Sequence, residues 1–137
     1  NKRLSYYLDS IGLPHTVEFQ NDLSVEIMEY GRDLDFDNLS RGERNRLILS
    51  LSWAFRDVWE HLYNNINLLI IDELVDSGMD TLGLEGAISI LKKISRDRKK
   101  SVFLISHKDE LSGRVHSVLT VTKENGFTNY SDDVQIM

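Results

Sequence analysis

The sequence predicts an α/β lobe in which a largely parallel sheet is packed by helices, with a short antiparallel hairpin at each end. Two short apolar runs, at residues 68–71 and 102–105, have the length and composition of strands buried on both faces of a parallel sheet. The residues between them carry apolar side chains at helical spacing. In such a strand–helix–strand unit the two strands run parallel and the crossover is right-handed.

Residues 1–12 have the pattern of the end of a helix. Leu4, Leu8 and Ile11 fall on one side of it, and Gly12 follows where helices commonly stop. We expect this helix to run on upstream of residue 1.

The next segment alternates apolar and polar residues with a period of two. Val17 and Phe19 alternate first, and Leu23, Val25 and Ile27 follow after Gln20-Asn21-Asp22. The alternation predicts two strands joined by a turn at 20–22. Residues 31–38 are acidic and turn-rich, which predicts a loop.

A long helix, residues 40–63, is expected to start at Ser40. Ser40 and Glu43 have the spacing of a capping box, in which each side chain accepts from the backbone N–H of the other residue. A stripe of apolar residues at helical spacing follows and is expected to face the core. Its members are Leu47, Leu51, Ala54, Phe55, Val58 and Leu62.

A second helix is expected at about residues 81–98. Its cationic end, residues 96–100, suits the negative end of the helix dipole. The residues expected to face inward are Leu84, Ala87, Ile88, Leu91 and Ile94. Towards the C-terminus, residues 118–121 and 126–130 predict a hairpin around 123–125, and residues 131–137 are expected to be loosely held.

Composition limits the classes of protein to consider. The length of 137 residues and the 41% of hydrophobic residues predict one domain. The chain has no cysteine, so we expect neither disulfides nor thiolate metal sites. It has no apolar stretch long enough for a membrane span and no signal-peptide pattern at residue 1, so we expect an intracellular, cytoplasmic protein. The net charge of −6 argues against a nucleic-acid module with a broad basic face and leaves a local DNA contact open.

Polar residues follow both predicted parallel strands. Asp72 and Glu73 come directly after the first, and Ser106 and His107 after the second, so these residues are expected to emerge on one edge of the sheet. At such an edge Asp72 can hold Mg²⁺ bound to nucleotide phosphates, and Glu73 can accept a proton from water. His107 can hydrogen-bond a phosphate or a water. The other interpretation is two acids in a solvated turn and a surface histidine.

The segment Leu39-Ser-Arg-Gly-Glu43 is also open to two interpretations. It is a well-formed helix start, and free N–H groups beside a glycine and a serine hydroxyl also make an anion site. The Ser40 hydroxyl can accept from the helix amide while it donates to a phosphate oxygen.

Four motifs together resemble those of ABC-type ATPases in order and spacing. Leu39-Ser-Arg-Gly-Glu43 resembles the signature motif, and Leu68-Leu-Ile-Ile-Asp72-Glu73 resembles Walker B. Ser77-Gly-Met-Asp80 and Ile105-Ser-His107 resemble the D-loop and the switch histidine. The acidic fifth signature residue and the helix end ahead of the domain are similar to the SMC/SbcC branch. Within it the chain looks most like the ATPase subunit of SbcC-type repair nucleases, among them those of phage recombination endonucleases.

The resemblance covers roughly residues 23–122 and implies the C-terminal lobe of an ATP-binding head, residues 13–137. Residues 1–12 would be the end of a helix from a coiled coil. The implied ligands are ATP and Mg²⁺. The implied partners are an N-terminal Walker A lobe of the same protein, a second head in a homodimer, a nuclease subunit and DNA.

The resemblance also implies roles for individual residues. Asp72 would hold Mg²⁺, Glu73 would polarise the attacking water, and His107 would sense the γ-phosphate. Asp80 would lie at the dimer seam. The signature residues would contact the nucleotide held by the opposite subunit, and they are Ser40, Arg41, Gly42 and Glu43.

Three features depart from the family pattern. Arg41 stands where the first of two signature glycines is usual, and Leu74-Val75 replace a common Pro-Thr. These residues contain no Gly-x-x-x-x-Gly-Lys-Ser/Thr motif, so the chain alone is expected to be inactive as an ATPase. Two rivals remain: a receiver-like, Mg²⁺-binding interaction domain without catalysis, and an SMC-type head that tethers DNA.

Overall fold

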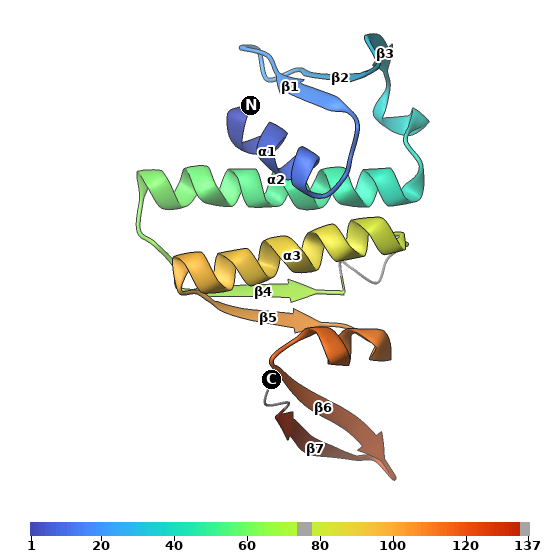
Figure 1. The fold of residues 1–137 in the computed structure, drawn as a ribbon, viewed down its shortest axis with the longest axis vertical. Helices are drawn as coiled ribbons and strands as arrows, with labels where there is room; N and C mark the ends of the chain where they lie inside the picture. Colours follow the sequence, from blue (N-terminus) through green and yellow to red (C-terminus); the bar gives the residue numbers. More distant parts are fainter. Residues whose placement is uncertain (74–77, 135–137) are drawn as a thin grey trace. The chain divides into compact units, whose positions relative to one another are not determined.

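The predicted parallel pair of strands lies at the centre of the described α/β unit. Strand β4 (Leu68–Asp72) pairs with β5 (Ser101–Ile105), with Leu68 opposite Ser101 and Asp72 opposite Ile105. Helix α3 (Thr81–Arg98) connects them and packs against β5 (Figure 1). The predicted fold class, a parallel sheet with flanking helices and antiparallel hairpins, is confirmed.

The computed structural model describes residues 1–73 and 78–134. Asn1–Ile105 form one compact unit and Ser106–Met137 form a second. The predicted segment Leu74-Val75 and the first D-loop residue, Ser77, lie outside the described residues.

The N-terminal part of the first unit contains one more strand than the sequence predicted. Strands β1 (Thr16–Phe19), β2 (Val25–Glu29) and β3 (Arg32–Leu34) form an antiparallel sheet in that order, followed by the short helix η1 (Phe36–Asn38). The predicted loop at 31–38 was therefore wrong. Tyr30 and Gly31 both have positive φ, the geometry of a tight two-residue hairpin turn, and this turn starts β3.

The predicted strand residue Leu23 is also outside the sheet. It has a φ of 69° and lies in the turn between β1 and β2, where its N–H donates to Gln20 O at 3.0 Å. A left-handed backbone is incompatible with a strand, so β2 starts later than the alternation indicated.

The helix predicted within residues 1–12 is confirmed, and its continuation upstream of residue 1 stays a prediction. Helix α1 spans Lys2–Ser10, and the three predicted apolar residues are buried together with Tyr7. Gly12 has a φ of +73° directly after the helix, as a terminating glycine should.

The long helix α2 (Arg41–Leu62) starts where the sequence predicted, but its apolar stripe faces differently. Leu47 and Ala54 are buried and Leu51 is partly buried, whereas Phe55, Val58 and Leu62 are exposed. Helix α1 packs against α2 on another side, with the Tyr7 and Trp53 rings 5.5 Å apart. The buried residues on that side include Leu49, Ser50 and Trp53.

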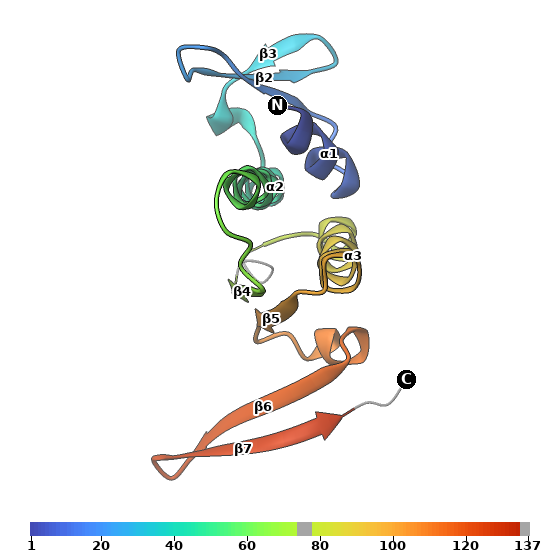
Figure 2. The ribbon, with the colours of Figure 1, turned by 90° about the vertical axis from the view of Figure 1, so that its left-hand side faces the viewer.

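All five residues of α3 that were predicted to face inward are buried. The backbone of α3 also packs closely against the end of α1, because a Cβ at Gly86 would lie 2.9 Å from Ile11 Cα. In Figure 2 the end of α1 accordingly lies beside α3.

The prediction that β4 and β5 are buried on both faces was wrong for this chain. Ile71 is buried, but Leu68, Ile70, Phe103 and Ile105 are exposed. The register places these four exposed residues on one face of the pair, because paired residues of parallel strands point the same way. α3 packs on the other face of the pair.

The second unit consists of the short helix η2 (Asp109–Arg114) and a hairpin of β6 (Ser117–Glu124) and β7 (Phe127–Val134). The turn is Asn125-Gly126, where both residues have positive φ, as a tight hairpin turn requires. The hairpin is longer than predicted, because residues 131–134 continue β7 instead of being loose. Residues 135–137 lie outside the described residues. Within the described parts of the chain, no helix is long and apolar enough to cross a membrane.

Candidate functional site

The first part of the candidate site is the carboxyl end of β4. Asp72 ends the strand and Glu73 follows it, and both are exposed. Glu73 has a left-handed backbone, with a φ of 49°, and its N–H donates to Ile105 O at 3.0 Å. This conformation costs a non-glycine residue about 1 kcal/mol and breaks the alternation of the strand. Two carboxylates are therefore presented at the sheet edge by two different backbone geometries.

His107 follows β5 by two residues. The last residue of β5, Ile105, lies opposite Asp72, so the chain leaves the sheet beside the two acids, as predicted. His107 is exposed and belongs to the second unit, together with Ser106, whose Oγ accepts from Lys108 N at 3.0 Å. The placement of the imidazole near Asp72 and Glu73 stays a prediction.

The second part of the site is the N-terminus of α2, where the capping box is confirmed. Ser40 Oγ accepts from Glu43 N at 3.3 Å, and Glu43 Oε2 accepts from Ser40 N at 2.8 Å. Hydrogen bonds from the Ser40 side chain and backbone lower the pKa of the Glu43 carboxyl. The Ser40 hydroxyl has one proton, which the Glu43 carboxylate takes up here, so a phosphate oxygen would compete with Glu43 for it.

Residues 78–80 approach this helix start closely. A Cβ at Gly78, whose φ is +90°, would lie 3.1 Å from Arg41 Cδ. A Cβ at Gly42 would lie 3.3 Å from Gly78 O. The structure thus brings the signature-like residues and the end of the D-loop-like segment together. Arg41, which replaces a glycine of the family pattern, lies over Gly78.

Asp80 has two interactions within the lobe. Its Oδ1 accepts from Gly83 N at 2.9 Å and so caps α3, and its Oδ2 is paired with Arg46 Nη2. The hydrogen bond from the Gly83 N–H and the Arg46 charge lower the pKa of Asp80. The Asp80 side chain nevertheless remains 58% exposed.

Arg46 is a residue that the sequence interpretation missed. Its side chain is 8% exposed, and its Nη1 donates to Gly12 O at 2.9 Å. An available signal was its helical spacing from Leu49, Ser50 and Trp53, all of which are buried. Arginine on a helix is mostly solvent-facing, so this pattern was outweighed by the residue type.

The described residues contain no group of three or more His, Cys, Asp or Glu side chains that could hold a metal ion by themselves. The edge of the sheet fits a different kind of site. Mg²⁺ commonly keeps several waters and is bound by one or two carboxylates plus substrate phosphates. The exposed Asp72 carboxylate at the end of β4 suits that role.

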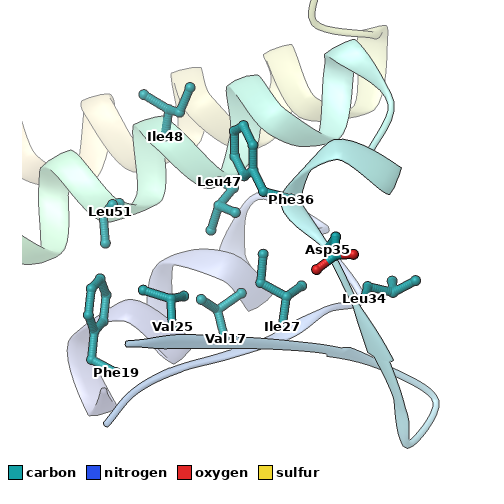
Figure 3. Close-up of a pocket in the computed structure, with 10 residues that line it drawn as sticks. All are labelled: Val17, Phe19, Val25, Ile27, Leu34, Asp35, Phe36, Leu47, Ile48 and Leu51. Atoms are coloured by element: carbon teal, nitrogen blue, oxygen red, sulfur yellow. The ribbon is translucent and has the colours of Figure 1, made fainter. Parts of the chain in front are cut away.

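An apolar groove of about 310 Å³ lies between the β1–β3 sheet and α2 (Figure 3). Valine, leucine, isoleucine and phenylalanine side chains line most of it, and Asp35 is its one acidic lining residue. None of the predicted site residues lines this groove, so it does not belong to the candidate site.

Comparisons with known proteins agree with the resemblance drawn from the motifs. No family model matches the chain. The exonuclease subunit 2 proteins of Escherichia phage RB69 and Enterobacteria phage T4 are each 28% identical to it over 130 residues, or 93% of the chain. The chain spans 23% of the length of each relative.

Solved structures of SMC heads share the fold. A structure described as "Structural biochemistry of ATP-driven dimerization and DNA stimulated activation of SMC ATPases" superposes with a TM-score of 0.77 and 13% identity, covering 96% of this chain and 81% of that one. The SMC head domain from Thermotoga maritima gives a TM-score of 0.71 at 21% identity, covering 99% of this chain and 47% of that one. The chain therefore shares the fold of these SMC heads.

Proposed function

We propose that this chain is the C-terminal lobe of a head that binds and hydrolyses ATP, dimerises on ATP and drives a DNA repair and recombination nuclease. The observation that carries the proposal is the carboxyl end of β4. There Asp72 and the left-handed Glu73 stand exposed, next to the end of the parallel neighbour β5. Open α/β sheets bind their ligands at this edge.

The two acids would divide the work of hydrolysis. Asp72 would hold Mg²⁺, which when bound neutralises charge on the phosphates. Glu73 would accept the proton of the attacking water, and His107 would hydrogen-bond the γ-phosphate.

The start of α2 would serve the nucleotide held by a second, identical head. Ser40 would donate its hydroxyl proton to the γ-phosphate, and Gly42 would offer its backbone N–H. Arg41 would add a cation beside them, and Glu43 would keep the serine in place through the capping box. Asp80, close to this helix start, would lie near the seam between the two heads.

The exposed apolar surfaces of the first unit support a further lobe of the same protein. Large apolar side chains that water solvates poorly are exposed at two places. One is the face of the sheet formed by Leu68, Ile70, Phe103 and Ile105, and the other is α2, at Phe55 and Trp59. A lobe carrying the Walker A phosphate cradle would cover them and complete the ATP site. The nuclease would be a separate subunit that acts on DNA, as the likeness to phage exonuclease subunits suggests.

ATP-driven dimerisation tests the proposal. In the full-length protein, Ser40→Arg should leave the fold intact and abolish dimerisation on ATP, measured by light scattering. The substitution removes a cap worth about 1 kcal/mol and places a long side chain where the γ-phosphate would sit. Ser52→Arg is the matched control, because Ser52 is exposed on the same helix away from its N-terminus.

Two outcomes would contradict the proposal. If Ser40→Arg heads still dimerise on ATP, Ser40 is a helix cap and nothing more. If the wild-type protein neither dimerises on ATP nor hydrolyses it, the ATPase function itself is wrong.

The rivals make other predictions. A receiver-like domain would carry its acid pair near the first strand of the chain and a lysine at the end of a late strand, whereas here Asp72 and Glu73 follow β4, a middle strand, and His107 follows β5. Solved structures of SMC heads share the fold of this chain. An SMC-type tethering head remains the second candidate. A copurifying nuclease subunit would favour the repair complex over it.

A further inference from the structure

Arg46 lies where three helices meet. It stands in the second turn of α2, its Nη1 donates to Gly12 O just after α1, and its Nη2 pairs with Asp80 at the start of α3. Its Nε is buried and has no hydrogen-bond partner among the described residues. A planar guanidinium is suited to such a fork, because it holds two acceptors in fixed directions.

The packing around Arg46 leaves little room for it to move. A Cβ at Gly83 would lie 2.6 Å from Arg46 Nε, 2.8 Å from Met79 Cγ and 3.0 Å from Asp80 Oδ1. Glycine at this position of α3 therefore lets the guanidinium reach the carboxylate.

Asp80 is the point through which Arg46 reaches the candidate site. Asp80 ends the segment that begins with Gly78, and Gly78 lies against Arg41 and Gly42 at the start of α2. Fixing Asp80 thus fixes the approach of residues 78–80 to the helix start that would meet a nucleotide.

We propose that Arg46 is a positioning residue for ATP hydrolysis. By joining Asp80 to the end of α1, it holds residues 78–80 against the N-terminus of α2. This inference rests on the proposed function. Arg46 is 92% shielded from solvent and touches no nucleotide in this scheme; it acts through Asp80. It also joins the Gly12 backbone, just after α1, to the site.

The test compares Arg46→Met and Arg46→Lys with wild type in the full-length protein, through kcat and KM for ATP and the melting temperature. Arg46→Met should lower kcat per folded head by about 10- to 100-fold with little change in KM, because misplacing catalytic groups slows turnover and the phosphate cradle on the other lobe sets binding. Lysine keeps the charge but cannot hold both acceptors, so Arg46→Lys should restore part of the rate. Arg96→Met, on an exposed arginine of α3, is the control.

Two further variants separate positioning from simple folding. Gly83→Ala leaves Arg46 and Asp80 in the sequence, and alanine suits a helix better than glycine, yet its Cβ displaces the guanidinium. It should also lower kcat. Arg46→Met combined with Asp80→Asn should be no slower than Asp80→Asn alone, because both changes break the same contact, the pair between Arg46 and Asp80.

The outcomes are distinct. Unchanged kcat per folded head in the Arg46 and Gly83 variants, with only the melting temperature lowered, overturns the inference and leaves the proposed function intact. If the losses of kcat caused by Arg46→Met and Asp80→Asn multiply in the double variant, the inference is also overturned. A wild-type protein without ATP turnover overturns the proposed function and this inference with it.

Discussion

Asp72 and Glu73 are neighbours in sequence and differ in backbone. Asp72 has the last strand position of β4, whereas Glu73 adopts a left-handed conformation held by its hydrogen bond to Ile105 O. At the scale of single residues this difference matters because it gives adjacent acids separate directions and surroundings. Separate roles, one in metal binding and one in proton transfer, are the expected consequence.

Substitutions of the two acids should give different phenotypes in the full-length protein. Glu73→Gln keeps the size of the side chain but cannot take a proton, so hydrolysis should fall by about 10²–10⁴-fold while ATP binding and the closed dimer persist. Asp72→Asn should instead weaken Mg²⁺-dependent ATP binding. Nucleotide titrations and phosphate release measure the two effects, with exposed Glu26→Gln as control. Wild-type turnover by Glu73→Gln would show that another group is the base.

His107 should matter for hydrolysis and little for stability. It is exposed at the start of the second unit, so His107→Ala should lower ATP turnover in the full-length protein and shift the melting temperature by little. His116→Ala changes another exposed histidine of the same unit and should leave turnover unaffected. A large drop in melting temperature for His107→Ala would indicate a structural histidine instead.

At the scale of elements, one buried acid joins the helices α1, α2 and α3 of the first unit. The Asp57 carboxylate on α2 accepts a hydrogen bond from the Tyr7 hydroxyl of α1 at 2.8 Å. It also accepts from both Nη groups of Arg98 on α3, with Nη2 at 2.9 Å from Oδ2. Burial raises the pKa of Asp57, but the hydrogen bonds from Arg98 and Tyr7 outweigh it and leave this pKa below its ordinary value. Burial and the Asp57 carboxylate raise the pKa of Tyr7 to about 12, so the phenol stays a donor.

Asp57→Asn should therefore destabilise the chain in a pH-dependent way. Loss of the charged hydrogen bonds should cost of the order of 2 kcal/mol in the free energy of unfolding at neutral pH. Because the folded pKa of Asp57 is lowered, its stabilisation is present above the ordinary carboxyl pKa of about 4 and is lost as the pH falls below that value. Denaturant titrations at several pH values should show that the difference in free energy of unfolding between Asp57→Asn and wild type becomes smaller in acid.

The matched control for this change is Asp97→Asn. Asp97 is paired with Arg96 on the surface of α3, where an ion pair contributes little. A cost for Asp97→Asn as large as that for Asp57→Asn, or a cost for Asp57→Asn that does not depend on pH, would contradict the argument.

At the scale of the whole chain, the described residues would supply only part of the ATP site that we propose. The candidate acids Asp72 and Glu73, the signature-like helix start and the segment 78–80 are present, but the sequence has no phosphate-cradling Walker A motif. Two apolar faces, one on β4–β5 and one on α2, are exposed in the first unit. Both features fit a lobe that works only in a larger assembly.

The 137-residue chain alone should consequently bind ATP poorly and not hydrolyse it. The missing cradle supplies most contacts to the phosphates in P-loop enzymes, so its addition should restore both properties. Nucleotide affinity and turnover, measured for the chain alone and then with the Walker A lobe, check this. Robust turnover by the chain alone would refute the half-site interpretation.

The sequence by itself determined the elements whose signals are local. The parallel strands 68–72 and 101–105, the capping box at Ser40 and the inward face of α3 all follow from patterns within one segment. A capping box needs only residues three apart, and a helix packed along one face shows that face in its periodicity.

Tertiary structure alone decided which polar groups are buried and which apolar ones are not. Arg46 and Asp57 are charged residues whose burial depends on partners 34 and 41 positions away, Asp80 and Arg98. Phe55 looked like core but is exposed, because α1 packs on a different side of α2. Burial depends on which elements meet, and a single segment of sequence carries no record of its distant neighbours.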